Sequence, residues 1–237
     1  MGQSEVSAAH WRHVYRDLRG QIDQGVLPPG ARLPSIAALA SDHGLTAHGA
    51  RRVLESLRDE GKVASWQGHS NRVAEPQLTY RVERTPGFGK GTARLGHQAS
   101  SRMIAARTTR ATAEIAKAMS LRTGTRVYQS ELLRLVDGRP VSLARNHFQT
   151  DRFEGILEDL AATGSVTKAL ALHGVTIWRR KDTRVEARLP TPHETLALKI
   201  PAQQPVIVTT GVNVDEDGEV VEVSQTTLRA DRVALEI

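Results

Sequence analysis

Cysteine is absent from this 237-residue chain. Disulfide bonds and thiol chemistry are therefore excluded, and a reducing cytoplasm is permitted. Long apolar runs are absent too, since none approaches the ~18 residues of a membrane span. The opening residues, MGQSEVSAAHW, lack the apolar core of a signal peptide. These absences lead us to expect a cytoplasmic protein that does not use a membrane as its partner.

Sequence motifs of common enzymes are also missing. The chain has no Gly-x-Ser-x-Gly segment that would present a hydrolase nucleophile. Its nine histidines are scattered, and no His-x-x-x-His pair beside a glutamate suggests zinc. The carboxylates of Asp215, Glu216 and Asp217 fall in an expected turn, where water would solvate them. We therefore expect no catalytic residues, no bound metal and no cofactor.

Residues 14–73 predict three short amphipathic helices followed by a glycine-centred hairpin. Apolar residues recur at helical spacing along the first helix, and Gly25 ends it. Ser35 is the expected N-cap of the second helix, and Thr46 of the third. The tight turn around Gly44 joins these two helices as in a helix-turn-helix, whose second helix enters the major groove of DNA.

The segment contains a set of residues with characteristic spacing, namely Tyr15, Leu18, Ile22, Gly25, Pro29-Gly30, Leu33-Pro34-Ser35, Leu39-Ala40, Gly44, Arg51, Leu54, Leu57, Gly61 and Gln67-Gly68. With these residues it resembles the GntR family of winged-helix regulators. The resemblance implies that DNA is the partner and that transcriptional control is the function.

The segment departs from the family pattern where DNA would be contacted. Ile36 replaces a usual glutamate, Ala47 replaces an arginine that would reach guanine, and Gly49 replaces a hydroxyl residue that would contact the DNA backbone. Gly49 within a helix also costs ~1 kcal/mol relative to alanine. We therefore expect a changed operator sequence or weaker binding.

Nine residues are candidate DNA contacts. For Arg51 and Arg52 the alternative is a solvated helix face, and the two histidines of the set are as readily surface residues. The set is Arg32, Ser35, Thr46, His48, Gly49, Arg51, Arg52, Gly68 and His69.

The formal net charge of +6 is unevenly distributed. Residues 1–75 contain 9 basic and 8 acidic residues, whereas the rest of the chain contains 23 and 18. The positive excess therefore lies mostly outside the expected DNA-binding segment. It fits an anion-binding pocket in the C-terminal part, or simply a surface of solvated arginines.

Composition divides the chain into three parts. We expect a winged helix-turn-helix domain over residues 1–75, a linker over 76–87 and an effector-binding domain over 88–237. The glycine-rich loop over 87–91 is either an anion-binding nest of backbone amides or a flexible connector.

Strands interspersed with short helices are expected after the linker. Asp137-Gly138 between two apolar runs indicates a hairpin, and Asp215 to Gly218 indicates a second one. Further short helices are expected near Thr112, Ser165 and Thr191. The pattern predicts an α+β domain with a largely antiparallel sheet.

The C-terminal part contains several short motifs, namely Leu133-Arg134-Leu135, Asp137-Gly138-Arg139-Pro140-Val141, Phe153, Asp215 to Gly218 with Val221-Glu222, and Arg229-Ala230-Asp231-Arg232. With these motifs it resembles the UTRA effector domain of the histidine-utilisation-repressor branch of the GntR family. Within the branch, Thr183-Arg184, Ala187-Arg188 and the closing run to Val233 look most like regulators of phosphonate metabolism. The implied fold is chorismate-lyase-like, but no residues supply a catalytic set, so a lyase is a distant alternative.

The resemblance implies a pocket for a phosphate or carboxylate group between the sheet and the helix ends. It carries over Phe88, Gly89, Arg134, Ser165, Thr167 and Glu222. Ala144 and Thr167 depart from relatives that bind amino-sugar phosphates, which argues against a sugar phosphate.

Strand register decides whether further side chains join Arg134. If Asp137-Gly138 forms a two-residue turn, Arg134 faces Val141 and shares a sheet face with Arg145 and His147. A one-residue slip would move these two away. Surface or cross-strand ion pairs are the alternative roles of Arg134 and Glu222.

The sequence as a whole indicates a homodimeric transcription factor. We expect a repressor on a pseudo-palindromic double-stranded DNA operator, released by a small anionic effector of phosphonate or phosphate type. The alternative is a ligand-binding module of the same family with weakened or altered DNA binding.

Overall fold

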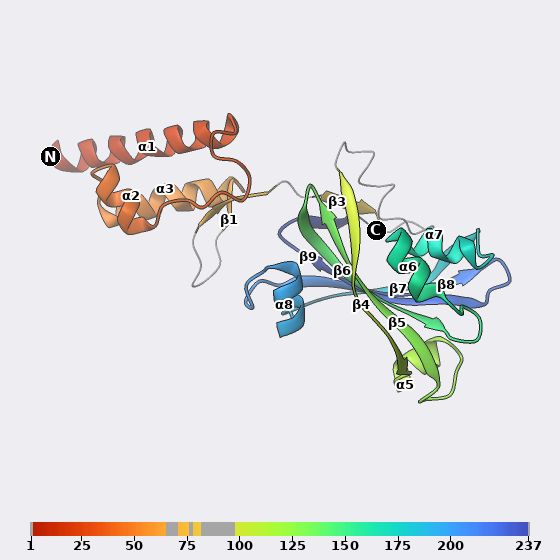
Figure 1. Cartoon of the computed structure of the whole chain (residues 1–237). Helices are drawn as coiled ribbons and strands as arrows, with labels where there is room; N and C mark the ends of the chain where they lie inside the picture. Colours follow the sequence, from red (N-terminus) through yellow and green to blue (C-terminus); the bar gives the residue numbers. More distant parts are fainter. Residues whose placement is uncertain (1, 65–70, 76–77, 82–97, 237) are drawn as a thin grey trace. The chain divides into compact units, whose positions relative to one another are not determined.

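A computed structural model describes residues 2–64, 71–75, 78–81 and 98–236 (Figure 1). The chain forms two compact units, Met1–Gln77 and Leu78–Ile237. In the described part, no helix is both long and apolar enough to cross a membrane.

The first unit is a winged helix-turn-helix. Its elements are α1 (Gly2–Asp23), α2 (Ile36–Asp42), α3 (Ala47–Asp59), β1 (Val63–Ala64) and β2 (Arg72–Val73). As predicted, Ser35 Oγ accepts a hydrogen bond from Ala38 N at 3.1 Å, and Thr46 Oγ1 accepts one from Gly49 N at 3.1 Å. Gly25 follows α1 with φ +74°, a backbone conformation that favours glycine. The apolar faces of the three helices meet in one core that includes Val14, Leu18, Leu39, Val53, Leu54 and Leu57.

The second unit is an α+β domain built on one six-stranded antiparallel sheet. The sheet has the order β4-β5-β6-β9-β8-β7. The elements are β3 (Leu78–Arg81), β4 (Ala99–Arg110), α5 (Ala113–Ala118), β5 (Arg126–Val136), β6 (Arg139–Gln149), α6 (Ile156–Thr163), α7 (Val166–Leu172), β7 (Trp178–Arg188), α8 (Pro192–Leu198), β8 (Val206–Asp215), β9 (Val220–Arg229) and β10 (Val233–Glu236).

Helices cover both faces of this sheet (Figure 1). On one face, Leu132 and Ala144 pack against α6 and α7, and we call this the α6–α7 face. On the other, Leu133 and Leu143 pack against Leu198 of α8, and we call this the α8 face. The small helix α5 packs against Val127 and Val223, which also lie on the α8 face. Because strand side chains alternate, each residue of the sheet is assigned to one face by its register.

The hairpin at Asp137-Gly138 forms as predicted, but its register differs from the regular one. Both turn residues have positive φ, 51° and 74°, as a two-residue hairpin turn requires. A β-bulge follows between Arg134 and Leu135, so Arg134 pairs with Ser142 instead of Val141. The bulge lies beside Pro140, which has no N–H to donate to the ladder.

Two features of this unit were not expected from the sequence. Residues 78–81, placed in the linker, form β3, which pairs in parallel with β10. Leu78 of β3 and Val233 of β10 join Val136, Val141 and Leu228 in a separate cluster at one end of the sheet. Helix α6 was missed as well. Gly155 and Gly164, both in the left-handed conformation, bound it.

Candidate functional site

Polar side chains converge on the α6–α7 face of the sheet. Glu222 of β9 is 3 % exposed, and Asn213 of β8 donates a hydrogen bond from Nδ2 to its Oε2 at 2.6 Å. Burial raises the pKa of the Glu222 carboxyl. The Asn213 hydrogen bond and the positive charges of Arg134 and Arg180 oppose that rise without cancelling it. Arg134 and Glu222, two residues carried over from the family resemblance, therefore act on each other electrostatically.

Several buried polar atoms of this face have no hydrogen-bond partner. They come from four strands, and strand register places their residues on the same side as Arg134. Buried polar groups are normally satisfied, so a cluster of unsatisfied ones is typical of a place that receives a polar ligand or water. In the described part of the chain these atoms are Ser101 Oγ, Ser142 Oγ, Asn146 Oδ1, Asn213 Oδ1, Arg180 Nε and Arg180 Nη1. We call this set, with Arg134 and Glu222, the polar cluster.

The start of α7 lies at the edge of the polar cluster. A Cβ atom at Gly164 would stand 3.1 Å from the Ser101 carbonyl oxygen, so this connection runs against β4 where Ser101 pairs with Arg134. Ser165 caps α7, its Oγ accepting from Lys168 N at 3.3 Å. Thr167 lies on an exposed side of α7. The predicted contacts Phe88 and Gly89 lie outside the described residues.

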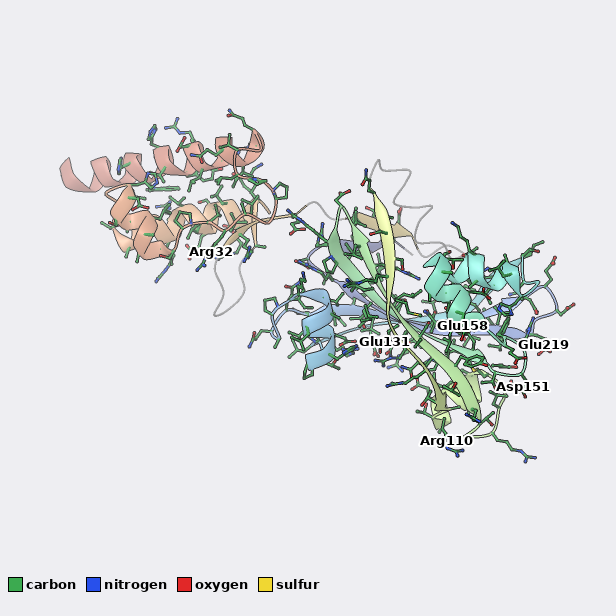
Figure 2. The ribbon with its side chains drawn as sticks, in the orientation of Figure 1. Arg32, Arg110, Glu131, Asp151, Glu158 and Glu219 are labelled. Atoms are coloured by element: carbon green, nitrogen blue, oxygen red, sulfur yellow. The ribbon has the colours of Figure 1, made fainter. Side chains whose placement is uncertain are left out.

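The expected neighbours Arg145 and His147 lie on the opposite, α8 face. The bulge beside Pro140 shifts the register by one residue, so the regular-turn prediction is wrong and its slipped alternative holds. Arg145 donates from Nε and Nη2 to Glu131 Oε1 at 2.9 and 2.7 Å, on the α8 side of the sheet (Figure 2). His193 Nε2 lies 2.6 Å from Glu131 Oε2. Arg145 thus belongs to a carboxylate-centred ion cluster.

His147 is buried in the same face and is 8 % exposed. Burial lowers the pKa of its imidazole to about 4, and the charges of Arg145 and Arg107 act in the same direction. A histidine with this pKa is neutral at physiological pH, so it offers no positive charge to an anion.

In the first unit, the start of α3 carries several exposed residues. Ala47, His48 and Arg51 are exposed. Arg51 has no hydrogen-bond or ion-pair partner among the described residues. Arg32 forms a β-bridge to Arg72 beside the wing strands (Figure 2). The predicted wing contacts Gly68 and His69 lie outside the described part of the chain.

Two candidate DNA contacts pack against Trp11 of α1. The Arg52 guanidinium carbon lies 4.4 Å from the centre of the Trp11 ring, a cation–π geometry. Gly49 is buried, and a Cβ atom there would lie 3.7 Å from Trp11 Cβ and 3.4 Å from Thr46 Oγ1. Its position therefore faces α1 and not solvent, contrary to its place among the candidate contacts. A Cβ atom there would make only ordinary van der Waals contacts, so the packing of α3 against α1 leaves room for alanine at this position.

Known protein families match both units. The model described as bacterial regulatory proteins of the gntR family matches residues 11–73, and the UTRA domain model matches residues 94–234. The chain belongs to the GntR family. It is a transcriptional regulator of the GntR type with a UTRA domain, and the relatives and fold it shares are those of regulators, not enzymes.

Individual relatives agree with this family membership. The chain is 31 % identical over 236 residues to an uncharacterized HTH-type transcriptional regulator, RB1450, of Rhizobium meliloti (strain 1021), covering 99 % of this chain and 97 % of that one. It is 30 % identical over 139 residues to the histidine utilization repressor of Pseudomonas putida, covering 59 % and 56 %. The crystal structure of PhnF from Mycobacterium smegmatis has the same fold, with a TM-score of 0.65, 21 % identity and coverage of 94 % and 97 %.

Sequence reasoning missed five members of the polar cluster in this GntR-family chain, namely Ser101, Ser142, Asn146, Arg180 and Asn213. All five lie within strands, where isolated polar residues do not stand out from the solvated positions. One signal was available. Gly211 lies inside β8, and an interior strand glycine is typical of a bulge or a close approach of another backbone.

Proposed function

We propose that this protein is a dimeric repressor whose operator binding is released by a small anionic effector bound at the polar cluster. The observation that carries the proposal is the convergence of Arg134, Arg180 and Glu222 with buried, unsatisfied polar atoms on one sheet face. Guanidinium groups bind phosphonate, phosphate and carboxylate groups through charge-assisted, often bidentate hydrogen bonds, so a group of this kind suits the site.

DNA recognition in this proposal rests on the exposed start of α3. His48 and Arg51 offer donors to base edges or phosphates, and Thr46 and Ser35 lie at helix starts, where backbone N–H groups favour phosphates. Two copies would place one such helix on each half of a pseudo-palindromic operator.

A gel-shift titration with the DNA upstream of the protein's own gene tests the proposal. The full chain is titrated at fixed salt, alone and with inorganic phosphate, methylphosphonate or 2-aminoethylphosphonate. We expect specific binding, released by at least one of these anions in the wild type but not in Arg134→Gln. Arg51→Ala should weaken specific binding by about 1–3 kcal/mol, whereas Arg58→Ala, in the last turn of the same helix, should not. Release of DNA from Arg134→Gln as from the wild type would refute the assigned site.

Weakened DNA binding is the second candidate function. Ala47 is exposed but offers no side-chain donor, and Gly49 faces Trp11. If the wild type binds an anion by calorimetry but shows no preference for any DNA, the protein is a ligand-binding module. Ala47→Arg should then increase DNA affinity, because it adds a donor on the exposed side of the recognition helix.

A further inference from the structure

A β-bulge in the edge strand β7 directs Arg180 over the sheet. The bulge lies between Arg180 and Asp182, and Asp182 Oδ1 accepts a hydrogen bond from Val212 N at 3.2 Å. Bulges are frequent beside binding sites because they re-aim a side chain. Arg180 pairs with Asn213, the hydrogen-bond partner of Glu222, so its side chain starts on the α6–α7 face.

Gly211 makes room for this arrangement. A Cβ atom at Gly211 would lie 3.1 Å from the Asp182 carbonyl oxygen and 3.8 Å from Arg180 Nε. The first distance is too short for an ordinary contact, and the second shows that the Arg180 side chain lies directly over the glycine. Glycine at this strand position therefore leaves room both for the Asp182 carbonyl of the bulge and for the Arg180 side chain.

Arg180 is not explained by an ion pair. Its Nε and Nη1 atoms are buried and lack hydrogen-bond partners. Among the described residues, the Glu222 carboxylate has Asn213 as its hydrogen-bond partner and no ion-pair partner. Burying a guanidinium group with unmet donors is costly, so a structural role alone leaves Arg180 unaccounted for.

Arg134 and Arg180 lie on the same sheet face as Glu222, on strands to either side of β9. Glu222 is on β9, Arg134 is on β5 and Arg180 is on β7, each two strands away. Four strand spacings amount to roughly 19 Å between β5 and β7. The register also offsets the two arginines along the strands, because Arg134 is level with Ser142 and Leu228 whereas Arg180 is level with Asn213 and Glu222. The separation of their Cα atoms is therefore larger than the strand spacings alone give. One phosphonate or carboxylate group is too small to contact both guanidinium groups.

We propose that Arg180 is a second effector contact and that the effector carries two separated acidic groups, one for Arg134 and one for Arg180. This inference rests on the proposed function, because it assumes that the polar cluster is the effector site. It identifies the effector class as small, elongated dianions, such as phosphonocarboxylates or dicarboxylates. A lone inorganic anion would occupy only half of the site.

Calorimetry with two matched probes tests the inference. The probe 4-phosphonobutyrate carries two acidic groups, while butylphosphonate has the same chain length with a methyl group in place of the carboxylate. We expect the full-length wild type to bind 4-phosphonobutyrate about tenfold or more tightly than butylphosphonate, as one charge-assisted hydrogen bond implies. Arg180→Gln should abolish this preference. Arg179→Gln, a change of the exposed neighbouring residue on β7, should leave it intact.

Two further variants separate the site from the fold. Arg180→Lys keeps the charge and should retain part of the preference. Gly211→Ala keeps Arg180 but displaces it, and should reduce the preference in a protein whose thermal melting shows that it is folded.

An unchanged preference in folded Arg180→Gln overturns the inference, as does a wild type that binds both probes equally. If the wild type binds both probes equally and Arg134→Gln binds neither, the proposed function stands and only the second contact is wrong. If the wild type binds neither probe nor inorganic phosphate, the anionic effector itself is wrong and the inference falls with it.

Discussion

Buried charged residues of the polar cluster lower the stability of the ligand-free fold. Glu222 is a buried carboxylate on the α6–α7 face, with one amide as its hydrogen-bond partner among the described residues. Burial favours its protonated form, because a charged group loses hydration that one amide does not replace. If this position served folding alone, a neutral amide side chain would make the folded state more stable than a carboxylate does. Glu222 is therefore better explained by a bound partner than by the stability of the free domain.

Glu222→Gln should stabilise the ligand-free protein in a pH-dependent way. The folded-state pKa of Glu222 lies above its ordinary value of 4.5. Below the ordinary value the carboxyl is protonated in both folded and unfolded states, so the substitution has little effect. As pH rises above the ordinary value and through the raised pKa, ionisation of Glu222 destabilises the folded wild type. The variant has no such group, so its free energy of unfolding becomes about 1–3 kcal/mol larger than that of the wild type.

Urea unfolding at pH 4 and pH 8 measures this difference. The variant should also lose its response to anions, which tests the functional role separately. A variant less stable than the wild type at pH 8 would mean that Glu222 is satisfied in the fold.

At the scale of elements, turns were predictable and bulges were not. Asp137-Gly138 determines a hairpin through the positive φ that its two residues adopt, which is a local property. The bulge beside Pro140 depends on how a whole strand finds its neighbour, and it exchanges the sheet faces of Arg145 and His147. The same limit applies to Arg180, whose direction follows from the β7 bulge. The sequence therefore predicted the antiparallel sheet and named Arg134 and Glu222 as candidate contacts, but it did not indicate the other side chains around them.

Helix α8 is fixed to the sheet by one buried carboxylate. Glu194 accepts two hydrogen bonds from Arg188, both at 2.7 Å, one from Thr227 Oγ1 at 2.6 Å and one from Thr191 N at 2.8 Å. Burial alone would raise its pKa, but these hydrogen bonds outweigh burial and lower the pKa to about 2. The same residue completes the capping box of the helix.

Glu194→Gln should destabilise the second unit by about 2–3 kcal/mol at pH 7. This destabilisation is at the low end of the range for a buried ion pair, because water reaches the Arg188 side chain, which is 31 % exposed. Since the folded pKa is depressed, the wild type holds this stability above about pH 4.5 and loses it as pH falls towards 2. Glu186→Gln, which breaks the exposed Arg184–Glu186 pair, is the control and should cost under about 0.5 kcal/mol. Urea unfolding at pH 7 and pH 3 gives both differences, and equal losses in the two variants would contradict the anchoring role.

At the scale of the whole molecule, two compact units divide the tasks of a regulator. The helix-turn-helix unit has an apolar core of its own, and the polar cluster lies wholly within the second unit. A ligand bound in one unit can act on DNA bound by the other only if it has different affinities for two arrangements of the dimer. We expect the effector to favour an arrangement in which the two recognition helices do not fit both operator halves together.

Spin-label distances between the two copies of a dimer would measure this change. Because the chain has no cysteine, Asp59→Cys at the exposed end of α3 adds a single labelling site to each copy. We expect a defined distance between the two labels, shifted by saturating 4-phosphonobutyrate in the labelled wild-type background and unshifted when Arg134→Gln is added. The shift follows because bound ligand raises the population of the arrangement that binds it more tightly. An unchanged distance while the same probe releases DNA would show that release does not come from rearranged recognition helices. The absence of any label-to-label distance would show that the protein is not a dimer, and two-fold operator recognition would then be wrong.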